Sequence, residues 1–183
     1  MNKKGTYKPC AGIDSGDEIV ISGIAGRFPD SDNMNQLREN LFNKVDLVKA
    51  DHGRWKAEHP GIPKRMGTIN NLQKFDADFF RFSFEQAYAC DPMIRILLEH
   101  SYEAIIDAGI NPKQLRGKNT AVIVAISFVE TQEKLLSTDL QINGTNFVGC
   151  LRSTTANMIS YFLDLKGPSY TVDTACSSSL YAF

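Results

Sequence analysis

Residues 169–180 have the sequence SYTVDTACSSSL, which changes from a strand-forming to a helix-forming pattern at one cysteine. The β-branched and aromatic run Ser169–Asp173 predicts a central strand. The small residues from Ala175 onward predict a helix with Cys176 at its N-terminus. There the thiol would face unpaired N–H groups and the positive end of the helix dipole, which favour the thiolate. Small neighbours leave room for a sharp turn and a substrate, so Cys176 is either a nucleophile or a buried structural cysteine.

Local patterns elsewhere predict the other elements of an α/β protein. For example, Asp91 is a favourable helix cap and Pro92 fits the first helical turn, where its missing N–H has no cost. Strands that are apolar throughout and separated by long helices indicate an αβα layered fold, with a sheet covered on both faces. The further predicted strands are Glu18–Ile24 and Thr120–Ile126, and the predicted helices are 31–43, 91–109 and 152–163.

The two ends of the chain differ from this pattern. Residues 1–17 mix Lys, Gly, Pro, Asp and Ser without periodicity, which predicts a flexible leader. Residues 18–183 form one region of domain size and contain no internal repeat. Because an apolar helix has scarcely begun when the sequence reaches Phe183, we expect a piece of a longer domain, truncated just after Cys176.

Composition and charge exclude several classes of function. The 183 residues include 20 Lys and Arg against 21 Asp and Glu, a net charge of −1, which argues against nucleic-acid binding and a polybasic membrane surface. No apolar run approaches the ~20 residues that cross a bilayer, and no signal peptide is recognisable, so we expect a cytoplasmic protein. Neither a metal site nor a disulfide framework is predicted, because the cysteines are scattered singly at Cys10, Cys90, Cys150 and Cys176.

The stretch Val172–Leu180, VDTACSSSL, resembles the active-site motif of the β-ketoacyl synthases, whose D-T-A-C-S-S-S pattern holds the acyl-carrying cysteine. Ordered blocks elsewhere extend the resemblance, and they are Ile19–Pro29, Phe75–Phe80, Asp91–Gly109 and Lys166–Ser169. Residues 103–112 and 162–168 look most like the animal type I fatty acid synthase, although polyketide synthases share much of the pattern. Cys90, Met93 and Ile94 depart from the usual family residues, which bears on the subfamily rather than on the chemistry.

The resemblance implies a thiolase-like fold, of which this chain covers the N-terminal half. In that family the cysteine, here Cys176, takes an acyl group from the phosphopantetheine of an acyl carrier protein. A malonyl group on the carrier protein then loses CO₂ and attacks the acyl thioester. The backbone N–H of Cys176 would be one donor to the oxyanion. The implied partners are the acyl carrier protein and a second synthase chain in a homodimer, and the chain itself binds no cofactor or metal.

Three functions stay open at this stage. The first is the ketosynthase of a fatty acid synthase, the second is that of a polyketide synthase, and the third is a non-catalytic scaffold or dimerisation piece. The intact D-T-A-C motif favours an enzyme over a non-catalytic scaffold. Within this motif, Asp173 is expected to bond to the backbone near the turn. The family uses two histidines to polarise the malonyl thioester, but His52, His59 and His100 lie in no matching motif. The 183 residues alone are therefore predicted to be inactive in condensation.

Overall fold

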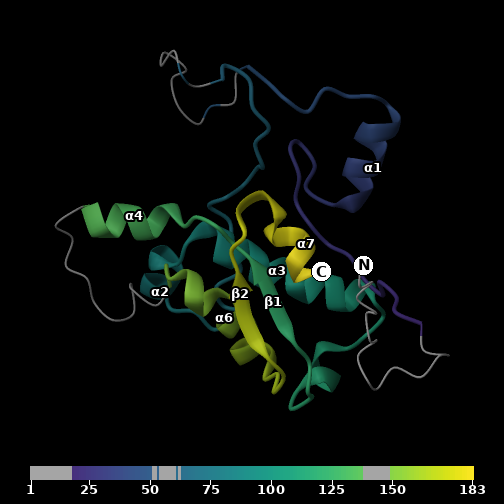
Figure 1. The fold of residues 1–183 in the computed structure, drawn as a ribbon, viewed down its shortest axis with the longest axis vertical. Coiled ribbons are helices and arrows are strands. Elements are labelled where there is room, and N and C mark those ends of the chain that lie inside the picture. Colours follow the sequence, from purple (N-terminus) through teal and green to yellow (C-terminus); the bar gives the residue numbers. More distant parts are fainter. Residues whose placement is uncertain (1–17, 51–52, 54–60, 62, 138–148) are drawn as a thin grey trace, which may run out of the picture.

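A small parallel sheet lies at the centre of the protein (Figure 1). The computed structural model describes residues 18–50, 53, 61, 63–137 and 149–183. Strand β1 (Val122–Ala125) pairs in parallel with β2 (Ser169–Val172), as both apolar runs predict. Parallel strands end at the same edge of a sheet, so the residues that follow Ala125 and Val172 come together. This edge positions the site described below.

The chain between the two strands contains one helix that packs on both of them. It includes α4 (Glu130–Ser137), the 3₁₀ turn η2 (Arg152–Thr154) and α6 (Thr155–Leu163). A parallel pair of strands requires such a long crossover connection. Helix α6 packs against both strands, and α3 (Pro92–Asp107) packs against α6 (Figure 1). The helix predicted at 152–163 is confirmed, with its first turn as 3₁₀ helix.

Helix α3 begins and ends where its sequence predicts. The Asp91 carboxylate accepts a 2.8 Å hydrogen bond from the Met93 N–H, and Pro92 is the first helical residue. Ile94 and Leu98, one turn apart, are buried against the rest of the core. Gly109 adopts φ +73° just beyond the last turn, a conformation that glycine accepts without steric cost.

The apolar core fills the space between α3, α6 and the two strands. Aromatic residues contribute much of it: the rings of Phe75 and Phe80 stack at 5.2 Å, and Phe80 lies 4.6 Å from Phe162. Phe80 therefore belongs to the core, and Phe75 packs against it. The buried apolar residues of the core include Phe80, Ile94, Leu98, Val124, Ile126, Val129, Ile159 and Leu163.

The buried strand predicted at Glu18–Ile24 is wrong. These residues form no strand, and Ile19 is 89% exposed. The segment instead runs along the C-terminal half of α3, where the Ile24 N–H donates to the Asp107 carboxylate at 2.9 Å. A Cβ added at Gly23 would lie 2.1 Å from the Ala104 carbonyl oxygen, so the backbone touches the helix directly. An apolar extended run becomes a strand only beside another strand, and none lies next to it among the described residues.

The absence of a strand at Glu18–Ile24 also bears on the prediction that β2 is a central strand. The sequence predicts a central strand, whereas β2 has β1 as its one strand neighbour in the described part of the chain. A central strand needs a partner on each side. The third predicted strand, at Glu18–Ile24, does not supply the second partner because it lies along α3.

Helix α1 (Met34–Phe42) extends away from the sheet in Figure 1. It starts after Asn33, whose side chain accepts a hydrogen bond from the Gln36 N–H, and so begins three residues later than the helix predicted at 31–43. No residue of α1 is buried, so its apolar positions do not join the core. Two further short elements are α2 (Phe84–Ala89) and the 3₁₀ turn η1 (Pro112–Leu115).

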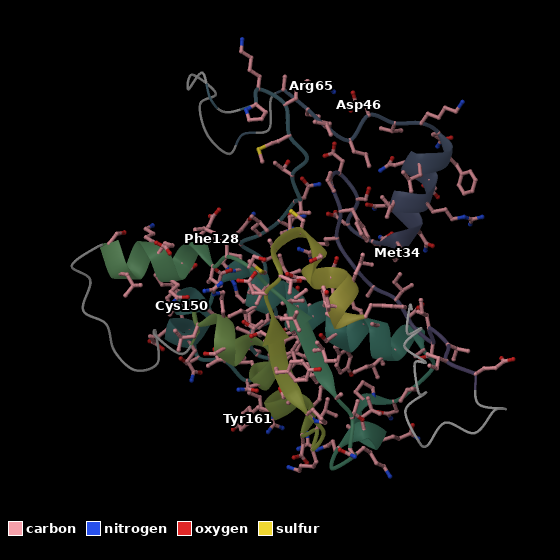
Figure 2. All side chains as sticks on the ribbon, in the orientation of Figure 1. Met34, Asp46, Arg65, Phe128, Cys150 and Tyr161 are labelled. Atoms are coloured by element: carbon pink, nitrogen blue, oxygen red, sulfur yellow. The ribbon has the colours of Figure 1, made fainter. Side chains whose placement is uncertain are left out.

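Beyond α1, two segments of the chain are joined by polar contacts. Arg65 pairs with the Asp46 carboxylate, and both residues are labelled in Figure 2. Arg65 also donates to the Val48 carbonyl. The hydrogen bond from the Val48 backbone, together with that from Arg65, holds the pKa of Asp46 below its ordinary value.

Residues 1–17, where a flexible leader is predicted, lie outside the described residues.

Candidate active site

Cys176 lies in the short turn that leads out of β2. This turn is the 3₁₀ segment η3 (Ala175–Ser177), and α7 (Ser178–Ala182) follows it directly. The Cys176 side chain is exposed to solvent. The predicted order of strand, cysteine and helix is confirmed, with the difference that Cys176 occupies a 3₁₀ turn two residues before α7 rather than the first turn of an α-helix.

The residue immediately before the cysteine has an unusual backbone conformation. Ala175 adopts φ +53°, in the left-handed region that alanine avoids. Such a residue costs about 1 kcal/mol and persists only where surrounding bonds hold it. The chain therefore reverses sharply at Ala175, and this sharp turn places the Cys176 thiol at the protein surface.

Hydrogen bonds from the following serines close the turn on one side. The Ser178 hydroxyl accepts from the Thr174 N–H at 2.8 Å and donates to the Ala175 carbonyl at 2.7 Å. The Ser177 hydroxyl donates to the Thr174 carbonyl at 2.8 Å. Ser178 is buried. The serines therefore act on the backbone of the turn, which agrees with their prediction as turn and helix-start residues.

Asp173 holds the other side of the turn. One carboxylate oxygen accepts a 3.2 Å hydrogen bond from the Ala175 N–H, and the other accepts a 2.7 Å hydrogen bond from Arg152. The bond from Ala175, then the bond from the Ser127 side chain, and the Arg152 charge keep the pKa of Asp173 below its ordinary value. The expected bond from Asp173 to the backbone is confirmed. An aspartate held ionised in this way is a poor candidate for a proton carrier near neutral pH.

Sequence reasoning missed Arg152. It lies 21 residues before Asp173, at the start of η2, and its Nη1 also donates to the Ser127 carbonyl at 2.8 Å. No local pattern marks this residue, because its partners follow the ends of two different strands. A basic residue at the start of the helix that crosses between two predicted parallel strands is the one available signal.

The other described cysteines are unlike Cys176. Cys90 and Cys150, the latter labelled in Figure 2, are both buried. Burial raises the pKa of the Cys90 thiol to about 12 and also raises the pKa of Cys150. Thiols of this kind are poor nucleophiles near neutral pH. Among the cysteines that the structure describes, exposure singles out Cys176, whereas Cys10 lies outside the described residues.

The structure also locates one of the three histidines. His100 lies within α3, and its Nδ1 is 2.6 Å from the Glu103 carboxylate on the next turn. The imidazole is therefore paired within its own helix. His52 and His59 lie outside the described residues.

The described residues contain neither a membrane-spanning helix nor a metal-binding cluster. No helix in residues 18–50, 63–137 or 149–183 is long and apolar enough to cross a membrane. The same part of the chain contains no group of three or more His, Cys, Asp or Glu side chains arranged to hold a metal ion.

Comparison with known sequences gives a consistent result. The sequence model of the family described as "Beta-ketoacyl synthase, N-terminal domain" matches residues 16–183. The chain is 49% identical to the fatty acid synthase of the goose Anser anser anser over 166 residues, which cover 91% of this chain and 47% of the relative. It is 39% identical over 178 residues to a phenolphthiocerol/phthiocerol polyketide synthase of Mycobacterium tuberculosis, and the match covers 90% of this chain and 11% of the relative.

Solved ketosynthase structures are also similar to this chain. The ketosynthase from module 6 of the bacillaene synthase of Bacillus subtilis 168 superimposes with a TM-score of 0.74 at 32% identity, covering 87% of this chain and 27% of that one. The fold is therefore thiolase-like, as the sequence predicts. The chain spans less than half the length of these relatives. On the family match and these similarities, the chain belongs to the β-ketoacyl synthase family and corresponds to its N-terminal domain.

Proposed function

We propose that Cys176 is the acyl acceptor of a fatty acid synthase ketosynthase. The observation that supports this proposal is the exposed cysteine on a sharp turn directly after a parallel strand, within the D-T-A-C-S-S-S motif of a β-ketoacyl synthase chain. The 49% identity to the goose fatty acid synthase favours this subfamily over the polyketide synthases at 37–40%.

The first chemical step is acyl transfer to Cys176. Its thiolate attacks the carbonyl of an acyl group bound to the phosphopantetheine sulfur of an acyl carrier protein. A new C–S bond forms to Cys176, the bond to the phosphopantetheine sulfur breaks, and the released thiol takes up the proton that Cys176 lost. The backbone N–H of Cys176 is proposed as one donor to the oxyanion of the tetrahedral intermediate.

The second step is condensation. A malonyl group on the carrier protein loses CO₂, the resulting carbanion attacks the Cys176 thioester, and the Cys176 thiolate leaves. By the family resemblance, this step uses two histidines that are not among those of this sequence. The chain therefore supplies the acyl-binding half of the reaction.

We also assign to the parent synthase a cytoplasmic location, a role in lipid metabolism and a homodimeric assembly, on family membership alone.

The test is covalent loading of Cys176 in the intact synthase. We expect incubation with an acyl carrier thioester to add one acyl mass to the peptide that contains Cys176. Cys176→Ala should abolish both this adduct and condensation, while the free energy of unfolding changes by about 1 kcal/mol because little buried volume is lost. The matched control is Cys150→Ala, a buried cysteine, which should still be acylated at Cys176. Normal condensation by Cys176→Ala would overturn the proposal.

A polyketide synthase is the second candidate, because ketosynthases of polyketide synthases are both sequence relatives and structural neighbours. Both candidates use the same acyl step, so the product decides between them. A fully saturated straight-chain acid released by the intact synthase supports the fatty acid assignment. Products that retain keto or hydroxyl groups support the polyketide assignment. A stable fold without acylation of Cys176 would favour a non-catalytic scaffold.

A further inference from the structure

Arg152 joins the ends of the two strands. Its Nη1 donates to the Ser127 carbonyl, just beyond β1, and to the Asp173 carboxylate, just beyond β2, at 2.8 and 2.7 Å. The two strands are still paired immediately before these residues, since the Ile126 N–H donates to the Val172 carbonyl at 3.1 Å. One guanidinium thus connects both chain segments at the sheet edge from which the Cys176 turn emerges.

The contact continues from Asp173 into the strained turn. The carboxylate oxygen that Arg152 does not bind accepts from the Ala175 N–H at 3.2 Å, and Ala175 is the residue with φ +53°. The Asp173 carboxylate fixes the peptide plane that precedes Ala175, and the Ser178 hydroxyl binds the Ala175 carbonyl on the other side at 2.7 Å. The left-handed conformation of Ala175 is therefore held between these two anchors. Arg152 therefore reaches the backbone next to Cys176 through Asp173 alone.

The exposure of the pair indicates that its role is geometric. The Arg152 and Asp173 side chains are 48% and 44% exposed, and exposed ion pairs add little to global stability. Arg152 is nevertheless bonded to the Ser127 carbonyl, and Asp173 accepts from the Ala175 N–H. Together with the ion pair, these two charge-assisted bonds to backbone groups set the orientation of the Asp173 carboxylate. Loss of the pair should leave the fold intact and loosen the turn.

We propose that Arg152 and Asp173 are positioning residues for acyl transfer, which hold Ala175 in its strained conformation so that the Cys176 thiol meets the acyl carbonyl in a fixed orientation. The role in acyl transfer rests on the function proposed above. The geometric part, that the pair restrains the Ala175 backbone, can be measured without any acyl chemistry.

The first experiment measures the rate of acyl loading of Cys176 in the intact synthase at increasing concentrations of acyl carrier thioester. We expect Arg152→Ala and Asp173→Ala each to lower the maximal rate about 10- to 100-fold, as small displacements of a reacting group do. The half-saturating concentration should not change, because the pair orients the thiol and does not bind the carrier. The double variant should be no slower than either single variant, and Arg152→Lys should regain part of the lost rate.

The matched control is Arg116→Ala. Arg116 is also an exposed arginine in a surface ion pair, with Asp164 at 3.8 Å. We expect wild-type acyl loading from this variant. Equal rate losses in Arg116→Ala and Arg152→Ala would overturn the proposal, and so would rate losses that multiply in the Arg152 and Asp173 double variant.

The second experiment measures amide hydrogen exchange of Ala175 by NMR in the 183-residue chain. Exchange should be several-fold faster in Arg152→Ala and Asp173→Ala, with the core amides of α3 and α6 unchanged. Asp173→Asn keeps an acceptor for the Ala175 N–H and should retain part of the protection even if Asp173→Ala fails to fold. Unchanged exchange at Ala175 in Arg152→Ala would overturn the positioning role. Faster exchange in a protein whose Cys176 is never acylated would support the restraint and reject the proposed function.

Discussion

At the level of single residues, the cysteines differ in their access to solvent and in their acidity. Cys176 is exposed, whereas Cys90 is 2% exposed and has a pKa raised to about 12 by burial. Gly149 packs on Cys90 so closely that a Cβ there would lie 3.2 Å from its Cα. The environment of each thiol, and not the residue type, therefore separates an accessible thiol from a packing residue.

Selective alkylation tests this difference. At pH 8 a thiol of pKa about 12 is ionised in only about one molecule in 10⁴. Because burial raises the pKa of Cys90, its reactive thiolate appears only as the pH rises toward that value. We expect brief treatment of the native protein with iodoacetamide at pH 8 to label Cys176 and to spare Cys90 and Cys150, as read by peptide mass spectrometry. Labelling of all three in 6 M guanidinium is the control, and faster labelling of Cys90 than of Cys176 in the native protein would contradict the assignment.

At the level of elements, helix caps decide where the helices begin. Asp91 is 4% exposed and has two tasks, since one oxygen caps α3 and the other accepts from the Thr131 N–H in α4 at 3.3 Å. Asn33 caps the exposed helix α1 with a single hydrogen bond. The same kind of cap therefore has different consequences in the core and at the surface.

We expect Asp91→Ala to lower the free energy of unfolding by about 2–3 kcal/mol. It removes a cap, which contributes about 1 kcal/mol, and leaves the Thr131 N–H without the carboxylate. Asp91→Asn, which keeps an oxygen acceptor, should lose less. Asn33→Ala is the matched control, with an expected loss of about 1 kcal/mol or less. Urea denaturation measures all three, and a loss in Asp91→Ala no greater than in Asn33→Ala would count against this reading of the cap.

At the level of the whole molecule, a well-packed core coexists with exposed apolar side chains. The core lies between α3, α6 and the sheet, whereas Ile19 and Val20 at one end and Leu180 and Phe183 at the other are 70% or more exposed. The turn at Cys176 therefore lies next to a packed core, while Leu180 and Tyr181 of the following helix α7 are exposed to solvent.

The 183-residue chain alone should not condense acyl and malonyl groups. Losing one oxyanion donor already costs on the order of 10²–10³ in rate, and here the two histidines of the family mechanism are both absent from the sequence. The measurement is CO₂ release from malonyl carrier protein by the purified chain, with Cys176→Ala as the control. Release of CO₂ that depends on Cys176, with a β-ketoacyl product, would contradict this expectation.

The sequence by itself determined the features that depend on neighbouring residues. Asp91-Pro92 marked the start of α3, the β-branched runs marked β1 and β2, and the D-T-A-C motif marked the turn at Cys176. Caps, β-branched side chains and small residues act over a few positions, so a single sequence is enough to place them.

Only the tertiary structure decided the features that depend on distant partners. The run Glu18–Ile24 has the composition of a strand, but its position along α3 leaves it without a strand neighbour. Cys90 and Cys176 are both single cysteines in the sequence, and only packing buries one and exposes the other. The link from Arg152 to Asp173 spans 21 residues and exists because parallel strands bring their ends to one edge of the sheet.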